Sequence, residues 1–422
     1  MIGFIGLTHL GLNYSLATAA KGFDVICYDP DTSLVGGLRE GRFPIEEPGF
    51  RELFASHGSR IRFTSDILEL GKCGLVFFSL DIPTNERNES DLSRLDVLVD
   101  KTRSAISKSA AVVVLSQVRP GFMRALIARA NLPAESWFYQ VETLIFGAAV
   151  KRAMEPERYI IGAANPSASL PEAYDSWLSA FRCPRLVMRF ESAELAKIAI
   201  NLFLVSTVST TNTLAEICEA IGADWGEIAP ALRLDKRIGP HAYLKPGLGI
   251  AGGNLERDLV TVKGLAKEYG TEAGIVDAWQ RNSSHAKSWA LRVLERELLA
   301  AKPMARIALW GLAYKQDTHS IKNSAAMELV VQLSKCEIHA YDPAARFDPA
   351  LFKNLKVYTE AWSALHAADV LVIMTPWSEF ASADPSRIRA QMKGDLILDP
   401  YGCIDRSSCA AVGLRILRIG SA

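Results

Sequence analysis

Two glycines and an aspartate near the start of the chain have the spacing of a dinucleotide-binding turn. The segment Gly6-x-Thr8-x-x-Gly11 lies between a short apolar run and a helical stretch. In such a turn the first glycine permits the tight bend, the last permits close packing of helix on strand, and a pyrophosphate binds at the helix N-terminus. Asp29 follows about 20 residues later, where a carboxylate accepts from a ribose 2′-hydroxyl and repels a 2′-phosphate. This spacing predicts binding of NAD rather than NADP.

Thr8 departs from the glycine that usually stands in the middle of this motif, so the approach of the backbone to the pyrophosphate is altered. A degenerate glycine motif also fits an ordinary strand-to-helix turn, but the flanking elements and Asp29 favour the dinucleotide interpretation. The residues of the turn expected to contact the cofactor are Gly6, Thr8, His9, Leu10 and Gly11. We interpret His9 as a packing or loop residue rather than a catalyst.

The pattern of elements predicts two α/β domains on either side of a helical middle. Apolar runs alternate with helical stretches in both outer parts, which is typical of parallel sheets with helices on both faces. Residues 191–220 predict one long helix, and helical sequence resumes from 259 to about 299. We therefore predict an α/β fold with two Rossmann-like, doubly wound parallel-sheet domains joined by a long central helical region. The predicted domains are residues 1–190, 191–300 and 301–422.

The second α/β part repeats the outline of the first without its glycine motif. Asp342 follows a strand, as Asp29 does, but Gly311-Leu-Ala-Tyr-Lys315 is not a GxGxxG segment. We expect a nucleotide of another kind there.

Composition excludes several classes of protein. The 47 Lys and Arg residues balance 47 Asp and Glu residues, so a large basic surface for nucleic acid is not expected. No apolar run reaches the ~18 uninterrupted residues of a membrane-spanning helix, because Lys197 and Asn201 break the longest one. Seven scattered cysteines without CxxC spacing indicate reduced thiols rather than disulfides or a zinc site. We expect a cytoplasmic protein that binds no nucleic acid, membrane or metal.

Six spaced segments resemble the nucleotide-sugar 6-dehydrogenases, which include UDP-glucose, UDP-N-acetylmannosamine and GDP-mannose dehydrogenases. The segments are Gly41 to Gly49, Ile82-Pro83-Thr84 with Asp91 to Ser93, Ser116 to Gly121, Glu194 to Asn201, Asp235 to Gly239, and Gly311 to Ser324. The resemblance covers nearly the whole chain.

This resemblance implies an N-terminal domain that binds NAD, a C-terminal domain that binds the UDP moiety, and central helices that build a homodimer. Family members remove two hydrides from C6 through a cysteine thiohemiacetal and a thioester, since a thiolate is both a nucleophile and a leaving group. Implied cofactor contacts also include Pro83, Thr84, Ser116 and Gln117. Implied substrate contacts are Arg237, Gly249, Gly252, Gly253, Lys315 and Lys322.

The chain departs from the family at the position of the catalytic cysteine. Residues 246–258 align with the family segment without a gap, and the cysteine position is Asn254, whose amide cannot form a thioester. A family glutamate is replaced by Phe146, and the threonine of S-T-V by Gln117. Tyr401 occupies the position of a nucleotide-contacting arginine of the family. Lys322 replaces another family arginine, which keeps the positive charge but loses the bidentate hydrogen bonding of a guanidinium.

Other polar residues of the family site are kept. Lys197 and Asn201 lie four residues apart and share a helix face, where they can hold an alkoxide or carbonyl oxygen. Glu142 and Asp258 are candidates for proton transfer. The predicted catalytic residues are Lys197, Asn201, Glu142, Asp258 and Asn254. Structural roles are the competing interpretations: Asp258 as the cap of a helix starting at Leu259, and Asn254 as a loop residue in the left-handed conformation.

We therefore expect an NAD-dependent oxidoreductase that oxidises an alcohol of a nucleotide sugar, with a UDP-sugar favoured, to the carbonyl level without a thioester. One alternative is an epimerase that keeps NAD bound and oxidises its substrate transiently. The other is a catalytically inactive homologue that only binds a nucleotide sugar. Surface-polysaccharide synthesis is the setting that the resemblance implies.

Overall fold

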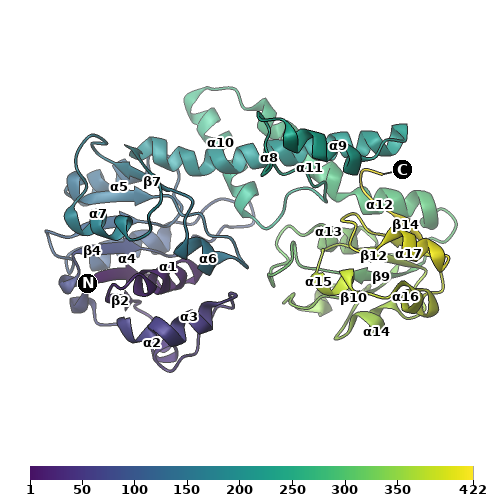
Figure 1. Ribbon diagram of the computed structural model, residues 1–422, viewed down its shortest axis with the longest axis horizontal. Helices are drawn as coiled ribbons and strands as arrows, with labels where there is room; N and C mark the ends of the chain where they lie inside the picture. The colour runs from purple at the N-terminus through teal and green to yellow at the C-terminus, as the bar shows by residue number, and fades with distance from the viewer. Residues whose placement is uncertain (422) are drawn as a thin grey trace. The chain divides into compact units, whose positions relative to one another are not determined.

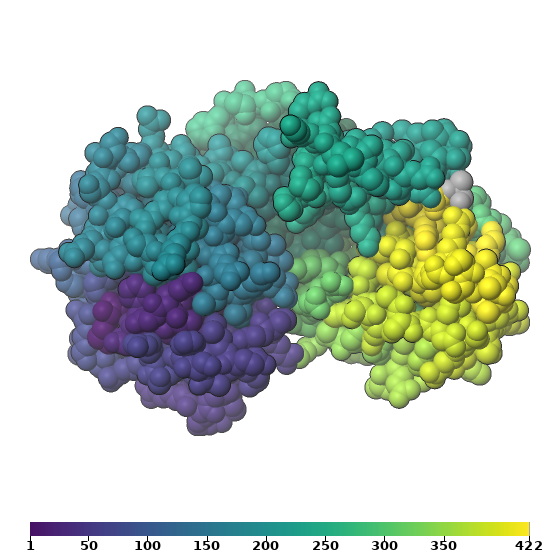
Figure 2. All heavy atoms as spheres, in the orientation of Figure 1, coloured from purple at the N-terminus to yellow at the C-terminus, as the bar shows by residue number. Residues whose placement is uncertain are grey.

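The computed structural model describes residues 1–421 and divides into two compact units, Met1–Ile200 and the remainder from Asn201 (Figure 1). The division falls inside the long helix α8 (Phe190–Ile221). The space-filling view of the same orientation shows the C-terminal segments, in yellow, forming much of the visible surface of the second unit (Figure 2).

The first unit contains an eight-stranded sheet in the order β3-β2-β1-β4-β5-β6-β7-β8. All neighbouring strands are parallel except β6 and β7. The strands are β1 (Ile2–Ile5), β2 (Val25–Tyr28), β3 (Ile61–Thr64), β4 (Leu75–Phe78), β5 (Ala111–Val114), β6 (Trp137–Gln140), β7 (Tyr159–Ala163) and β8 (Arg185–Arg189). The helices are α1 (His9–Ala20), α2 (Thr32–Arg39), α3 (Phe50–His57), α4 (Ser93–Thr102), α5 (Phe122–Ala130), α6 (Ala149–Met154) and α7 (Glu172–Ser179).

Alternation of side chains along the strands gives this sheet a hydrophobic core on each face. Phe77 packs with Phe4 and Trp177 in one cluster, whereas the next residue, Phe78, packs with Ile5 in the other. The chain reverses direction of winding between β1 and β4, so a crevice forms at the carboxyl ends of these two strands.

The second unit contains the helices α9 (Trp225–Leu234), α10 (Asn254–Tyr269), α11 (Gly274–Lys287) and α12 (Trp289–Leu294), followed by a six-stranded parallel sheet. The strand order is β11-β10-β9-β12-β13-β14. The strands are β9 (Arg306–Trp310), β10 (Glu337–Tyr341), β11 (Leu355–Tyr358), β12 (Val370–Ile373), β13 (Leu396–Leu398) and β14 (Arg415–Leu417). The remaining helices are α13 (Ala325–Gln332), α14 (Ala361–Leu365), α15 (Ser378–Ala381), α16 (Pro385–Gln391) and α17 (Arg406–Ala411).

These two sheets and the long helix confirm the predicted fold class. The helical run predicted from 259 differs in detail, because α10 begins at Asn254 and ends before Gly270, which has φ +67°. Within residues 1–421, α8 is the one helix that could cross a membrane by length and composition, and 33% of its most apolar window is buried. A single helix of this kind is weak evidence for a membrane span.

Candidate functional site

The Gly turn between β1 and α1 has no room for side chains at its ends. Gly6 has φ +90°, a conformation that favours glycine. A Cβ added to Gly11 would lie 2.1 Å from the Gly6 carbonyl oxygen and 2.8 Å from Ser79 Oγ. The first turn of α1 therefore approaches the strands closely enough to present its backbone N–H groups to a phosphate at the crevice.

Asp29 follows β2 and is fully buried. Its Oδ2 accepts from the Leu7 N–H (3.0 Å), its Oδ1 accepts from the Asp31 N–H (3.0 Å), and Arg94 Nη2 lies 3.7 Å from Oδ2. A carboxylate has about four lone-pair sites, so these two N–H bonds leave capacity for a ribose hydroxyl. The turn and this carboxylate together fit a dinucleotide.

Asp81, in the loop after β4, also reaches the Gly turn, a contact that was not predicted from the sequence. Its Oδ2 accepts from the Leu10 N–H (3.2 Å), and its own N–H donates to Thr8 Oγ1 (2.8 Å). Thr8 stands at the N-cap of α1 without capping it, so Asp81 supplies the acceptor. The available signal was a carboxylate three residues after the end of β4, the strand that neighbours β1.

The other predicted cofactor contacts lie in the loops that follow β4 and β5. Ser116 is buried, and its hydroxyl donates to the Leu80 carbonyl (2.7 Å), while Gln117 is 9% exposed. Thr84 forms a β-bridge with Ser90, and Pro83 is exposed. The internal hydrogen bond of Ser116 gives this residue a part in holding the loop.

His9 in the Gly turn pairs with Glu47. The His9 Nε2 atom lies 2.7 Å from Glu47 Oε1, and the Phe146 ring packs on the imidazole with centroids 4.3 Å apart. Glu47 also accepts from the N–H groups of Gly147 and Ala149. Although burial acts to raise it, the hydrogen bonds from His9 and Gly147 hold the pKa of Glu47 below its usual value.

Lys197 and Glu142 form an ion pair in the first unit. Lys197 Nζ lies 2.9 Å from Glu142 Oε1 and donates to the Glu142 carbonyl oxygen (3.0 Å). The Leu144 N–H donates to Glu142 Oε2 (3.0 Å). Only 12% of the Lys197 side chain and 17% of the Glu142 side chain are exposed, so each partner offsets the desolvation of the other.

Asn201 and Asp258 form the corresponding polar pair in the second unit. Asn201 Nδ2 donates to Asp258 Oδ2 (2.5 Å), and Arg257 Nε lies 3.4 Å from Oδ1 of this carboxylate, which is 1% exposed. Asp258 is the fifth residue of α10, so its interpretation as a helix cap is wrong. The cap is Gly253, whose N–H donates to Glu256 Oε2 (3.0 Å), and a helix that starts earlier turns Asp258 into an interior residue.

Asn254 is the first residue of α10 and is exposed. The left-handed interpretation of this residue is wrong, because the positive φ angles belong to Gly252 and Gly253 just before it. A Cβ on Gly252 would lie 2.3 Å from Tyr314 Cε2, and one on Gly249 would lie 2.6 Å from the Ser283 carbonyl. The glycines therefore let the loop pack tightly and fix where Asn254 begins the helix.

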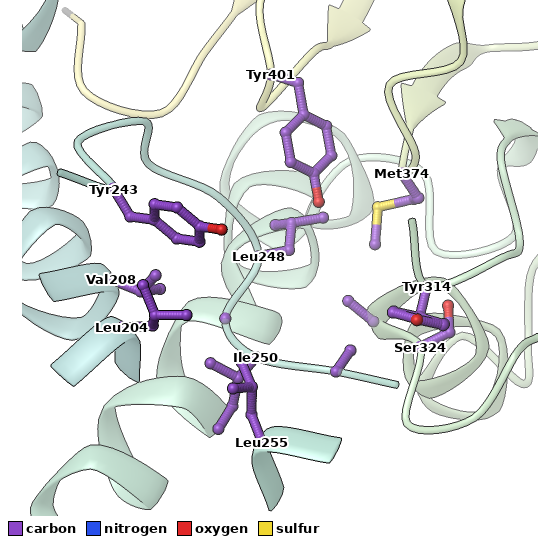
Figure 3. A pocket seen from close by; sticks show the side chains of 13 residues that line it. Leu204, Val208, Tyr243, Leu248, Ile250, Leu255, Tyr314, Ser324, Met374 and Tyr401 are labelled. Atoms are coloured by element: carbon purple, nitrogen blue, oxygen red, sulfur yellow. The ribbon is translucent and has the colours of Figure 1, made fainter. Parts of the chain in front are cut away.

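A cavity of about 190 Å³ lies next to this loop, within the second unit (Figure 3). Apolar side chains form much of its wall, and Tyr243, Tyr314 and Tyr401 line it as well. Figure 3 shows the Tyr401 hydroxyl pointing towards Leu248, whose backbone hydrogen-bonds to it. Burial raises the pKa of Tyr314 to about 12, so this phenol stays neutral.

The predicted substrate-binding cations are held in three different ways. Lys322 lies over the Gly loop: its carbonyl accepts from the Gly252 N–H (3.1 Å), and a Cβ on Gly253 would meet its side chain. Lys315 Nζ lies 5.9 Å from the centre of the Tyr314 ring. Arg237 pairs with Asp235 (2.7 Å), and 89% of its side chain is exposed.

The cysteines show no activated thiol. Burial raises the pKa of Cys27 and of Cys403 to about 12, and that of Cys73 to about 11, and it also raises the pKa of Cys183, Cys336 and Cys409. Cys218 is buried. Among residues 1–421 there is also no group of three or more His, Cys, Asp or Glu that could hold a metal ion.

Three domains of one family match most of the chain. The NAD-binding domain of the UDP-glucose/GDP-mannose dehydrogenase family matches residues 1–178, its central domain matches 191–284, and its UDP-binding domain matches 308–406. The chain belongs to this family. Its cofactor is accordingly NAD, and it is an oxidoreductase, while the third match supports a nucleotide-sugar substrate.

Individual family members are similar over their full length. The UDP-glucose 6-dehydrogenases of Rickettsia typhi and Pseudomonas aeruginosa are each 28% identical to this chain, cover 100% and 99% of it, and are themselves covered to 99% and 96%. The structure of a UDP-glucose dehydrogenase from Pyrobaculum islandicum has a TM-score of 0.85 at 25% identity, with 100% of this chain and 98% of that chain covered.

Proposed function

We propose that this family member oxidises one alcohol group of a UDP-sugar to the carbonyl level and releases that product without a thioester step. One observation carries the proposal: Asn254 begins α10 directly after the Gly252–Gly253 turn, where the resemblance has the nucleophilic cysteine. A carboxamide has donors and an acceptor but no nucleophile of comparable strength. The raised pKa values of Cys27 and Cys403 support the same conclusion, because a protonated thiol does not attack an aldehyde.

Lys197 is the group that we assign to stabilising charge on the reacting oxygen. An ammonium has three N–H donors, and Glu142 accepts from Lys197 through its carbonyl and its carboxylate. A third donor remains to bind the substrate oxygen as negative charge develops on it. Bound NAD supplies the oxidising power by accepting a hydride. The ion pair with Glu142 offsets the cost of burying most of the lysine side chain.

Asn201 and Asp258 are assigned to orientation and proton transfer. One N–H of the Asn201 amide donates to Asp258, and the second can donate to a substrate oxygen. We assign Asp258, which contacts Asn201 and Arg257, to taking the alcohol proton through water. We propose that the other predicted site residues contact the cofactor or the substrate. We also propose that the chain consists of the domains 1–190, 191–300 and 301–422.

Epimerisation by transient oxidation is the second candidate, because Glu142 and Asp258 keep two carboxylates while the thiol is absent. Incubation with NAD and a panel of UDP- and GDP-sugars separates the possibilities. Net oxidation gives NADH absorbance and a carbonyl product by NMR, whereas epimerisation gives a changed sugar without NADH. Absence of turnover with every sugar contradicts both catalytic functions and leaves a binding protein.

Replacement of Lys197 with Ala tests the assignment of the oxyanion. We expect turnover to fall by about 1,000-fold, since one preorganised donor contributes roughly this much. Lys101→Ala, an exposed lysine at the end of α4, is the matched control and should keep full activity. Normal turnover by the Lys197 variant would refute the role.

We further propose a cytoplasmic homodimer. Several large apolar side chains of α8 are exposed, including Phe203 (77%), Ile217 (47%) and Ile221 (71%), and a second copy would cover them. Light scattering should give twice the mass of the chain, and Phe203→Asp should give the single mass. A wild-type chain of single mass contradicts this assembly.

A further inference from the structure

The first turn of α1 already holds an anion that belongs to the chain itself. The Leu10 N–H is one of the first-turn donors that a helix cannot satisfy internally, and it donates to the Asp81 carboxylate (3.2 Å). No acidic residue stands in the first turn of α1, so this charge comes from the loop after β4, 71 positions along the chain. The carboxylate therefore occupies the favourable end of the helix dipole.

This position coincides with the one that a dinucleotide needs. A pyrophosphate binds at the N-terminus of the helix after the Gly turn, in the crevice between the strand that precedes the turn and the neighbour across the winding reversal. Here those strands are β1 and β4, and Asp81 lies three residues after the end of β4. The Leu10 N–H cannot donate at full strength to both the Asp81 carboxylate and a pyrophosphate oxygen. The negative charges of the carboxylate and the pyrophosphate would also repel each other if both lay beside this N–H.

Thr8 strengthens this arrangement. It stands where the motif usually has a glycine, and its Oγ1 accepts from the Asp81 N–H (2.8 Å), which ties the loop after β4 to the turn. Thr8 and Asp81 thus form one hydrogen-bonded unit beside the phosphate position.

We propose that Asp81 is an internal competitor of the NAD pyrophosphate, so that it sets a low cofactor affinity that rises when its charge is removed. The inference rests on the NAD cofactor and not on the proposed fate of the sugar. Asp81 controls affinity by its charge at the Leu10 N–H, and it takes no part in the oxidation.

Two titratable neighbours contribute to the electrostatic field at Asp81. His9, on α1, favours the charged carboxylate, whereas Glu142, after β6, opposes it. Glu47 Oε1 lies 2.7 Å from Nε2 of the same imidazole. Asp81 is solvent-exposed, but desolvation by nearby protein atoms still raises the pKa of its carboxyl group above the usual value. Protonation removes the repulsion, so NAD affinity should increase as the pH falls.

Isothermal titration of the full chain with NAD tests the competition without any turnover. We expect Asp81→Ala to bind NAD about ten-fold more tightly than wild type at pH 7.5, and Asp81→Asn to show a smaller gain because it keeps an acceptor for the Leu10 N–H. ADP-ribose should show the same gain as NAD, since the two share the pyrophosphate. The wild-type affinity should rise as the pH falls, and Asp81→Ala should lose most of that rise.

Asp100→Ala is the matched control, because it removes one carboxylate from α4 in the same unit, where 58% of the side chain is exposed. Its affinity for NAD should equal that of wild type, and thermal unfolding should show both variants folded. An unchanged or weaker affinity of Asp81→Ala, or a gain for NAD but not for ADP-ribose, overturns the proposal. Failure of both the wild type and Asp81→Ala to bind NAD overturns it together with the cofactor assignment.

Discussion

The two sheets each end a strand with an aspartate after a glycine turn, yet the two carboxylates are used differently. Asp29 accepts from two backbone N–H groups, those of Leu7 and Asp31. Asp342 accepts from four backbone N–H groups, including those of Leu312 and Ala313 (2.6 and 2.8 Å), and also from Trp377 Nε1 (3.2 Å). The first carboxylate keeps capacity for a ligand, whereas the second is consumed in holding its own turn together.

This difference shows that a shared outline of strand, glycine, helix and aspartate does not define a shared site. The first turn packs a helix tightly through Gly11, while in the second the chain from Gly311 continues as a loop before α13 begins at Ala325. A ribose carboxylate is therefore available only in the first unit of the described chain. Asp342 is therefore not expected to serve as a ribose acceptor in the second unit.

Gly11→Ala should have the largest effect on this comparison. The new methyl group would lie 2.1 Å from the Gly6 carbonyl oxygen, which forces the helix away from the strand. We expect a loss of about 4 kcal/mol in the free energy of unfolding and no measurable NAD binding. Thermal and chemical unfolding with NAD titration measure both. Gly264→Ala, in α10 with open space around the glycine, should be neutral or stabilising. A Gly11 variant of normal stability would show that the turn is not closely packed.

Asp342→Ala should reduce stability without affecting NAD. Its removal leaves several donors, among them Leu312 N and Trp377 Nε1, without their acceptor. We expect the free energy of unfolding to fall by about 3 kcal/mol, while the affinity for NAD stays that of wild type. A large loss of NAD affinity in a folded variant would contradict the contrast between the two aspartates.

Asp29→Ala, in contrast, should affect NAD binding more than the free energy of unfolding. Loss of the ribose acceptor should weaken NAD binding by about ten-fold, and the preference for NAD over NADP should shrink because the repelling charge is gone. Titration with both cofactors measures this preference. An unchanged preference would show that Asp29 only supports the turn.

Tyr401→Phe should have the smallest effect. The hydroxyl hydrogen-bonds to the backbone of Leu248, and its ring packs against Gly247. Removing the oxygen should cost about 1 kcal/mol of stability and should leave NAD affinity unchanged, since the residue belongs to the second unit. Chemical unfolding measures the change, and a loss larger than that of Asp342→Ala would show that the phenol, not the aspartate, is the main polar support of this unit.

The local features of the site could be predicted from the sequence, and the long-range ones could not. Gly6, Gly11 and Asp29 have fixed spacing within one strand–helix–strand unit, so their arrangement follows from the sequence. Asp81 reaches the turn only because β4 lies beside β1, which requires the strand order. The pairing of Lys197 with Glu142, 55 positions apart, could not be predicted either, because it also depends on how distant elements are arranged in the fold.

The start of α10 was misplaced for a local reason. Helical sequence from Leu259 predicts the helix start there, whereas the Gly253 N–H donates to Glu256 Oε2 and the helix begins at Asn254. A glycine followed three residues later by a glutamate was a visible signal. The correction changes the interpretation of Asp258 from a cap to a buried partner of Asn201.

The central claim is that oxidation stops at the carbonyl, and the ratio of NADH formed to sugar consumed tests it most directly. With an accepted UDP-sugar, the wild-type chain should form one NADH per sugar, and the product should be trapped by hydroxylamine as a carbonyl compound. Asn254→Cys, which restores a thiol at the start of α10, should raise the ratio towards two, while Asn254→Ser should not. A wild-type ratio of two with a carboxylic acid as product would contradict the claim.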